Sequence, residues 1–186
     1  MNKTTSLSIA VLFALIAIPT SALAETYKID PAHSTILFKT QHFGAGYTYG
    51  RFMRFTGQLE TGKKSSVALE IDASSVFTAQ RKRDGHLKSP DFFNVKQFPK
   101  ISFKSTKVVA RGKTYTVTGD LTLHGVTKKI TVKMKLVGKG KNPMSKQELI
   151  GFEGSFSIKR SAYGMSKMIG PAGDVVTLTL AIEATK

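Results

Sequence analysis

Alternation of apolar and polar residues with a period of two constrains the fold of this chain more than any other feature. The apolar positions of the regular runs are Val67, Leu69 and Ile71; Ile101 and Phe103; Tyr115, Val117, Leu121 and Leu123; Ile130, Val132, Met134 and Leu136; Ile150, Phe152, Phe156 and Ile158; and Val176, Leu178, Leu180 and Ile182. Because successive side chains of a β-strand point to opposite faces, this spacing is typical of antiparallel strands with one buried face. The sequence therefore predicts an all-β protein.

Two earlier segments, residues 33–43 and 51–60, alternate less regularly. They place on one face, respectively, Ile36, Phe38, Thr40 and His42, and Met53, Phe55, Gly57 and Leu59. With the regular runs they make about eight strands, separated by turn sequences. Eight antiparallel strands can close into a barrel that has no sheet edges and holds one small ligand. We therefore expect an eight-stranded antiparallel barrel, although a two-sheet sandwich with a filled core fits the same pattern.

Residues 76–99 interrupt the alternation. Arg81 to Lys88 form a candidate short helix, although Gly85 lowers the helix propensity. A long irregular insert in a barrel is often a lid or part of the mouth, and a plain crossover loop is the alternative. The sequence thus predicts a short helical insert between two strands.

The predicted interior is rich in phenylalanine and also contains glycine. Its members are Phe38, Phe52, Phe55, Phe103, Phe152 and Phe156, with Gly57, Gly119, Gly151 and Gly154 among them. Glycine in a strand marks a bend or a close approach of two backbones, and it also leaves volume unfilled. The sequence supports both explanations.

The first 24 residues have the pattern of a cleavable signal peptide. Lys3 gives a positive start, residues 7–18 are apolar and uncharged, and residues 22–24 (Ala-Leu-Ala) form a small-x-small cleavage site. The apolar run is shorter than the roughly 20 residues that a membrane-spanning helix needs. We therefore expect export to the periplasm and one mature domain, residues 25–186. Disulfides are excluded, because the chain has no cysteine.

The mature chain is strongly basic. Of 28 Lys and Arg residues only Lys3 lies in the signal segment, so residues 25–186 carry 27 basic and 12 acidic residues. Such a surface attracts anionic membranes, polymers or phosphate-bearing ligands, and solvated outer strand faces are the simpler explanation. Nucleic-acid binding is not expected, because the aromatic residues alternate inward and leave few exposed stacking platforms.

The sequence shows no motif for catalysis or metal binding. Its histidines, His33, His42, His86 and His124, lack the spacing of a metal-binding pair. The sequence also lacks HExxH, GxSxG and Walker A patterns and a GxGxxG loop after a strand. We therefore predict no catalytic residue, no metal and no cofactor other than a bound ligand.

Four blocks of the sequence resemble the YceI family. They are YKIDPAHSTILFKTQHFGAG, DGHLKSPDFFNVKQFPKISFKST, VTGDLTLHGVTKKITV and FSIKRSAYGM, in this order over about residues 26–184. The resemblance implies an exported, lipocalin-like antiparallel barrel that binds a polyisoprenoid or another long-chain amphiphile. It implies a polar ligand end at the barrel mouth and a tail in the interior. It also implies a homodimer and no established catalytic activity.

The resemblance and the inward alternation together imply a ligand site of thirteen residues. Tail contacts are expected from Phe38, Phe55, Leu121, Phe152, Phe156 and Met165, and headgroup contacts from His42, His86 and Arg160. The other candidates are Phe92 and Phe93 near the opening, Leu123 in the third block, and Tyr163 in the late R-x-x-Y-G pattern.

The resulting hypothesis is a periplasmic protein that holds an isoprenoid quinone, a polyprenyl phosphate or another long-chain amphiphile, for transport or storage. One alternative is a basic surface protein with a filled core that binds anionic envelope lipids or polymers. Another is a small hydrolase with histidine and serine at the mouth. The first hypothesis requires an interior that can admit a chain.

Overall fold

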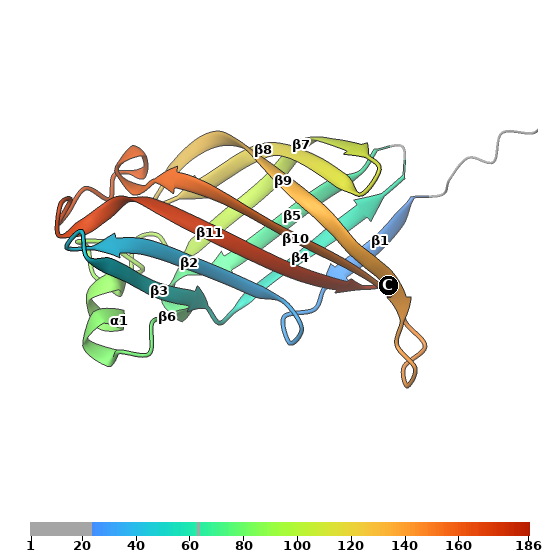
Figure 1. Cartoon of the computed structure of the whole chain (residues 1–186), viewed down its shortest axis with the longest axis horizontal. Helices are drawn as coiled ribbons and strands as arrows, with labels where there is room; N and C mark the ends of the chain where they lie inside the picture. The colour runs from blue at the N-terminus through green and yellow to red at the C-terminus, as the bar shows by residue number, and fades with distance from the viewer. Residues whose placement is uncertain (1–23, 63) are drawn as a thin grey trace, which may run out of the picture.

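The computed structural model describes residues 24–62 and 64–186, so the predicted signal peptide lies, apart from Ala24, outside the described residues. The described chain forms the predicted eight-stranded antiparallel barrel with one short α-helix (Figure 1). Within residues 24–62 and 64–186, no helix is long and apolar enough to cross a membrane. The elements are β1 (Glu25–Ile29), β2 (Thr35–His42), β3 (Gly46–Phe52), β4 (Phe55–Thr61), β5 (Ser66–Asp72), η1 (Ala73–Ser75), β6 (Val76–Phe77), α1 (Arg81–Lys88), β7 (Lys100–Arg111), β8 (Thr114–Leu123), β9 (Val126–Lys141), β10 (Glu148–Lys159), η2 (Arg160–Tyr163) and β11 (Ala172–Thr185).

Three of the eight strand positions are each shared by two short segments. β1 and β2 both pair with β11, β1 near its C-terminal end and β2 along residues 172–181. β4 and β3 occupy the next position, and β5 and β6 the one after it. The continuous strands β7 to β11 complete the ring, which closes through the β5–β7 and β1–β11 pairings. The two-sheet sandwich is therefore wrong.

The strand position of β3 and β4 is interrupted at Met53 and Arg54. The Ser75 hydroxyl accepts a hydrogen bond from the Arg54 N–H (3.0 Å), and the Met53 N–H donates to the Ser75 carbonyl (3.1 Å). The interruption shifts the alternation by one residue, so Phe52 and Phe55 are both buried while Met53 is exposed. The prediction that Met53 shares the inward face of Phe55 is wrong, because it assumed an unbroken strand.

A β-bulge reverses the inward face of β7. Thr106 is the extra residue between Ser105 and Lys107, which pair with consecutive residues of β8. Phe103 therefore lines the interior before the bulge and Val108 after it. β9 carries a second register shift against β10. Such bulges bend long strands as closure of a barrel requires.

Glycines of the barrel wall lie where two strands approach closely. A Cβ at Gly57 would lie 2.5 Å from the Ala68 carbonyl oxygen, and one at Gly154 would lie 2.6 Å from that of Lys133. Gly119 is in the same situation against β7. Close backbone approach thus explains these three glycines, and none of them lines a cavity.

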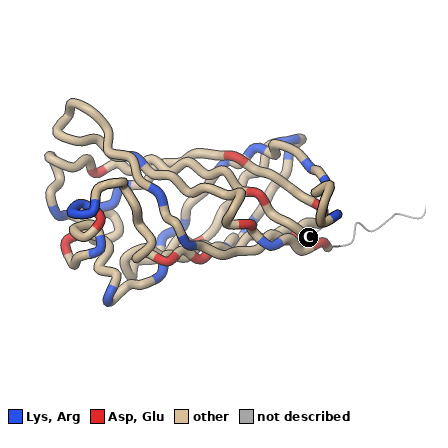
Figure 2. Tube along the Cα trace, turned by 90° about the horizontal axis from the view of Figure 1, so that it is seen from below, with Lys and Arg blue, Asp and Glu red and all other residues tan. Residues whose placement is uncertain are grey.

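The two ends of the barrel are built from different kinds of connection (Figure 1). What we call the mouth end comprises residues 43–45, residues 78–99 with α1, the β8–β9 turn and residues 160–171. The far end comprises the β4–β5, β7–β8 and β9–β10 turns, together with Glu25 and the C-terminus. Lys and Arg residues occur at both ends, including along α1 (Figure 2).

The helix α1 has the predicted bounds. It begins after Gln80, whose side-chain oxygen accepts a hydrogen bond from the Arg83 N–H (2.7 Å) and so caps the first turn. The Asp84 carboxylate accepts hydrogen bonds from the N–H (2.8 Å) and hydroxyl (2.5 Å) of Thr78 and ties the helix to the end of β6. These contacts hold α1 beside the mouth, although Gly85 lowers its helix propensity.

Candidate ligand-binding cavity

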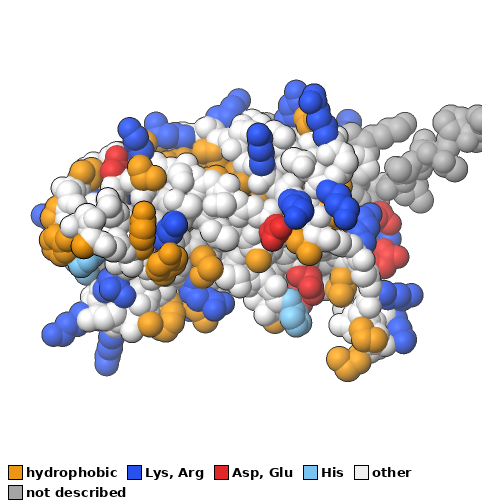
Figure 3. Space-filling model, in the orientation of Figure 1, with side chains coloured by type: hydrophobic (Ala, Val, Ile, Leu, Met, Phe, Trp, Pro, Cys, Tyr) orange, Lys and Arg blue, Asp and Glu red, His pale blue; other side chains and the backbone are white. Residues whose placement is uncertain are grey.

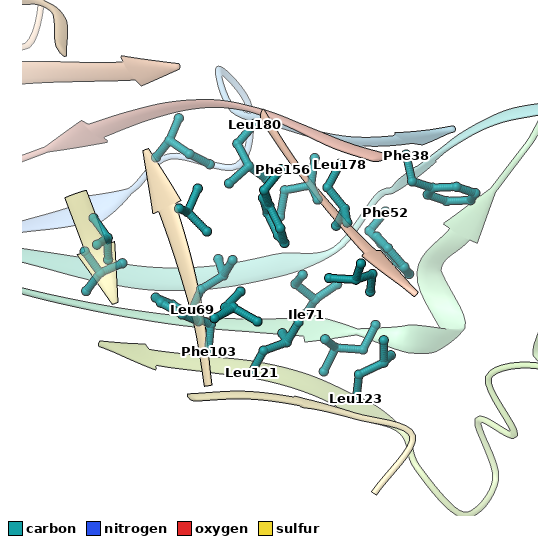
Figure 4. A pocket seen from close by; sticks show the side chains of 18 of the residues that line it. Phe38, Phe52, Leu69, Ile71, Phe103, Leu121, Leu123, Phe156, Leu178 and Leu180 are labelled. Carbon is teal, nitrogen blue, oxygen red and sulfur yellow. The ribbon is translucent and has the colours of Figure 1, made fainter. Parts of the chain in front are cut away.

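The barrel encloses a cavity of about 910 Å³, whose wall includes residues from all eight strand positions. Leu178 and Leu180 of β11 face Phe103 of β7 and Leu121 of β8 across it (Figure 4). The volume lies near the top of the roughly 300–1,000 Å³ that small-molecule sites occupy. The interior can therefore accept a large apolar molecule.

Several inward side chains remain only partly buried although the barrel surrounds them. Phe103, Phe152, Phe156, Leu178 and Leu180 belong to this group. In a close-packed core such residues would lose nearly all of their accessible surface. Their remaining accessibility reflects the empty space that they line, so the alternative of a filled core is wrong.

An aromatic cluster narrows the cavity at the mouth end. The ring centroids of Phe38 and Phe52 are 5.7 Å apart, and Phe52 meets Phe93 edge to face at 5.6 Å. Phe92, Phe93 and Leu87 all come from the insert that follows β6 and all line the cavity. The insert is therefore part of the mouth and more than a crossover loop.

Arg160 lies on the cavity wall, but its guanidinium is committed to the backbone. It is buried and donates hydrogen bonds to four carbonyls: Met165 (2.6 Å), Lys167 (2.8 Å), Ala172 (2.9 Å) and Gly173 (3.0 Å). Burial lowers the pKa of the Arg160 guanidinium, and the negative charge of Asp174 partly offsets this shift. Arg160 thus shapes the loop between β10 and β11, and these bonds use all but one of its guanidinium N–H donors.

The other polar side chains at the mouth differ in whether they already have a hydrogen-bond partner. The His86 Nε2 atom lies 3.0 Å from the Asp91 carboxylate, and this hydrogen bond lowers the pKa of Asp91. Arg83 donates to the carbonyl and hydroxyl of Thr78, both at 2.8 Å. The exposed His42 ring has no hydrogen bond to any described side chain, so His42 is the polar wall residue best placed to meet a ligand.

The cavity also reaches the far end, which the sequence did not predict. Its wall there includes Glu25, Glu60, Ser66 and Lys139, and Ser66 donates a hydrogen bond to Glu60 (2.8 Å). The alternation could not identify these residues, because they lie at strand ends where the regular pattern stops. The cavity therefore extends along the barrel between two polar ends.

Eleven of the thirteen residues predicted for the site line the cavity. They are Phe38, His42, His86, Phe92, Phe93, Leu121, Leu123, Phe152, Phe156, Arg160 and Met165. Phe55 and Tyr163 are buried but lie outside the wall. Phe55 packs in the core opposite Ile71, and the Tyr163 carbonyl contacts the His124 ring (3.1 Å). Ligand contact stays a prediction for the eleven and is not proposed for Phe55 or Tyr163.

Other wall residues were expected in the interior but not assigned to the site. They include Ile36, Phe52, Leu69, Phe103, Leu178 and Leu180. All but Phe52 follow the same inward alternation as Leu121 and Leu123. The strand pattern itself was therefore the signal that could have identified them.

One cluster of titratable groups lies apart from the cavity wall. The ligand atoms of Asp30, His33 and Glu183 all lie within 4.8 Å of one another. His33 Nδ1 is 2.7 Å from Asp30, which raises the pKa of His33 and lowers that of Asp30. His33 is exposed and the two carboxylates are half-buried, and His33 links the β1–β2 turn to Glu183 of β11 (4.0 Å).

Comparison with known proteins agrees with this architecture. The model of the YceI-like domain family matches residues 27–184. A UPF0312 protein of Pseudomonas aeruginosa is 40% identical over 171 residues, which covers 89% of each chain. The crystal structure of BcnA from Burkholderia cenocepacia has a TM-score of 0.76 at 24% identity, covering 84% of this chain and 99% of that one. A domain from Saccharophagus degradans has a TM-score of 0.69 at 17% identity, covering 86% and 97%, and is described as polyisoprenoid-binding.

Proposed function

Since the chain belongs to the YceI-like domain family, we propose that it holds an isoprenoid or another long-chain amphiphile in its barrel for transport or storage. The observation that carries the proposal is the empty interior of about 910 Å³, walled largely by aliphatic and aromatic side chains. One structural neighbour is described as a polyisoprenoid-binding domain, which supports this class of ligand.

Burial of the apolar tail would supply the binding free energy. Enclosing a few hundred Å² of hydrocarbon at about 25 cal/mol per Å² contributes roughly 10 kcal/mol. Association and ordering cost about 4–15 kcal/mol, so this burial alone would leave at most about 6 kcal/mol, and micromolar affinity would need a longer buried tail or headgroup contacts. Since the wall is largely apolar, affinity would rise with the length of tail that the cavity encloses.

Specificity for the headgroup would come from the mouth. The His42 ring is free to donate or accept a hydrogen bond. His86 also lines the cavity, and Asp91 holds its ring through a hydrogen bond. A quinone carbonyl or a phosphate oxygen would accept from these rings, and the basic mature chain favours a phosphate. Arg160 is not included, because its donors already serve four carbonyls.

The proposed setting is the periplasm, after cleavage behind Ala24, and the proposed role is binding rather than catalysis. Among the described residues none of the four histidines is hydrogen-bonded to a serine hydroxyl, as a serine nucleophile would require. The hydrolase alternative therefore gains no support from the site.

Mass spectrometry of an organic extract tests the proposal. The protein is purified from its native periplasm, extracted, and compared with a mock preparation. A stoichiometric isoprenoid or other long-chain amphiphile is the expected result. A protein that is empty, and that takes up neither added quinone nor polyprenyl phosphate, would overturn the proposal.

Two neighbouring residues of β11 provide a matched pair of variants. Leu180 lines the cavity, whereas Thr179 is exposed on the outer face. Leu180→Trp fills empty space, so we expect at least about tenfold weaker ligand binding with a change in stability below about 1.5 kcal/mol. Thr179→Trp should bind as the parent does. Equal binding by both variants would place the ligand outside the barrel.

A further inference from the structure

The mouth end carries four exposed apolar side chains, of which only Met168 lines the cavity. Phe43 is 66% exposed, Tyr47 58%, Met168 41% and Ile169 46%. We call these four residues the mouth rim. Phe43, Tyr47 and Ile169 do not line the cavity, so their exposure has no role in the proposed ligand site. Figure 3 shows hydrophobic side chains gathered at this end of the molecule.

Backbone hydrogen bonds join the two loops that carry Phe43, Met168 and Ile169, although these loops come from distant parts of the chain, and Tyr47 follows the first loop in β3. The Phe43 N–H donates to the Pro171 carbonyl (2.8 Å), and the Ala172 N–H donates to the Met168 carbonyl (2.9 Å). His42 pairs with Ala172 in the sheet, and a β-bridge joins Ile169 to Ala172. The loop after β2 and the loop before β11 therefore present their apolar tips side by side.

Two rim residues are held in a conformation that bulky side chains rarely adopt. Phe43 has φ of 49° and Met168 has φ of 56°, in the left-handed region that favours glycine and asparagine. Strain of this kind persists where the surrounding structure imposes it, and it clusters at functional sites. Here it holds a phenyl ring and a thioether in solvent, at a cost in both strain and apolar exposure.

Basic side chains without acidic partners lie on α1, on β2 and in the loop that carries Met168. Among the residues that the structure describes, Lys39, Arg81, Lys82, Lys88 and Lys167 have no carboxylate within ion-pair distance. The carboxylates at this end are already engaged by neighbouring side chains and backbone. The mouth therefore combines an apolar centre with a basic border.

We propose that the mouth end docks on a bilayer that contains anionic phospholipid, with the rim in the interface and the basic border against the headgroups. Aromatic and aliphatic side chains partition into the interfacial region, and nearby Lys and Arg residues add electrostatic attraction. The Lys39 Nζ atom lies 4.8 Å from the centroid of the Tyr47 ring, so a positive charge and an exposed aromatic ring lie side by side. Docking would bring the mouth end of the cavity against the membrane, so that a long-chain amphiphile could pass between them without crossing water.

Sedimentation with vesicles tests the proposal. The exported protein is incubated with vesicles of phosphatidylcholine alone, and with vesicles of equimolar phosphatidylcholine and phosphatidylglycerol. Binding to the anionic vesicles that weakens with added salt is expected. Absence of binding to the anionic vesicles, or equal binding to both kinds, would overturn the proposal.

The rim is tested by Phe43→Asn with Met168→Asn. Asparagine tolerates a positive φ, so this double variant should melt at the same or a higher temperature while its vesicle binding falls about tenfold. The control is Val137→Asn with Met144→Asn, which removes two exposed apolar residues at the far end (60% and 87% exposed). Parent-like binding of the rim variant would contradict membrane docking and leave the rim for a protein partner.

The basic border is tested by Arg81→Glu with Lys82→Glu. Acidic residues suit the first turn of a helix, so α1 should remain folded while binding to anionic vesicles falls at least about tenfold. Arg111→Glu with Lys113→Glu makes the same change in net charge at the far end. Equal losses in both variants would mean attraction by net charge alone and would overturn the proposed orientation. Ligand content, measured by extraction, is a separate readout that reports on the cavity.

Discussion

At the far end of the barrel, hairpin turns join neighbouring strands, whereas at the mouth end two long segments, residues 78–99 and 160–171, leave the sheet beside two short turns. The far end is held by backbone pairing that continues almost to the turns. The mouth end is held by side chains: Arg160 donates to four carbonyls, and Asp84 ties α1 to Thr78. The irregular end can therefore present groups that a regular ladder cannot.

The difference shows where a barrel of this kind places its function. Backbone pairing fixes the position of every residue in the barrel wall, so only the type of side chain can vary at an inward position. Loops can approach one another, expose apolar tips and aim histidines at an opening, but they need buried polar anchors to keep one shape. Substitutions at the anchors should therefore lower stability more than substitutions in the wall, because they leave several buried carbonyls without a donor.

The largest effect is expected at the mouth anchor. Arg160→Met removes the donor for four carbonyls, and we expect a loss of about 3 kcal/mol in the free energy of unfolding. Urea denaturation measures this loss. Arg111→Met, an exposed change at the far end, should stay within about 0.5 kcal/mol. A loss below 1 kcal/mol for Arg160→Met would show that the β10–β11 loop keeps its shape by other contacts.

A smaller loss is expected in the regular wall. In Gly119→Val the new side chain meets the backbone and Phe103 of β7, so we expect a loss of about 2 kcal/mol. Gly138→Val, on β9 with open space around it, is the matched control and should be neutral. Thermal unfolding measures both variants. Similar stability of the two would mean that β7 moves aside at little cost.

A gain is expected from the weakest element of the mouth. Gly85→Ala meets open space in the middle of α1 and should stabilise the helix by about 0.5–1 kcal/mol. Because α1 is a local unit, amide hydrogen exchange of residues 81–88 should slow more than the global unfolding rate changes. Unchanged exchange in α1 would show that packing, rather than helix propensity, limits its opening.

The smallest effect concerns acid sensitivity of the mouth. The Ser161 N–H and hydroxyl donate to the Asp174 carboxylate, and these bonds hold the pKa of Asp174 below its usual value. This carboxylate therefore adds stability above about pH 4, which is lost as the pH falls through its folded pKa. Asp174→Asn should melt below the parent at neutral pH, with a difference that shrinks in acid. A constant difference between about pH 6 and pH 2 would contradict this assignment.

Sequence reasoning worked where one rule governs many residues. Leu121 and Leu123 were assigned inward because alternation along a strand is local, and the same rule places Leu178 and Leu180 in the wall. It failed at Met53, where contacts from Ser75 interrupt the strand. The role of Arg160 was also hidden, because the carbonyls that it binds lie up to thirteen residues away along the chain. No local pattern records such a convergence.

The sequence by itself determined the all-β class, the inward side of most strands, the helix Arg81–Lys88 and the membership in a family. These features follow from local geometry and from motifs that are read along the chain. Only the tertiary structure decided that the interior is hollow, that Phe55 and Tyr163 lie outside its wall, and that the loops carrying Phe43 and Met168 lie side by side. Volume and surface depend on how distant segments approach one another, and that is fixed by closure of the barrel.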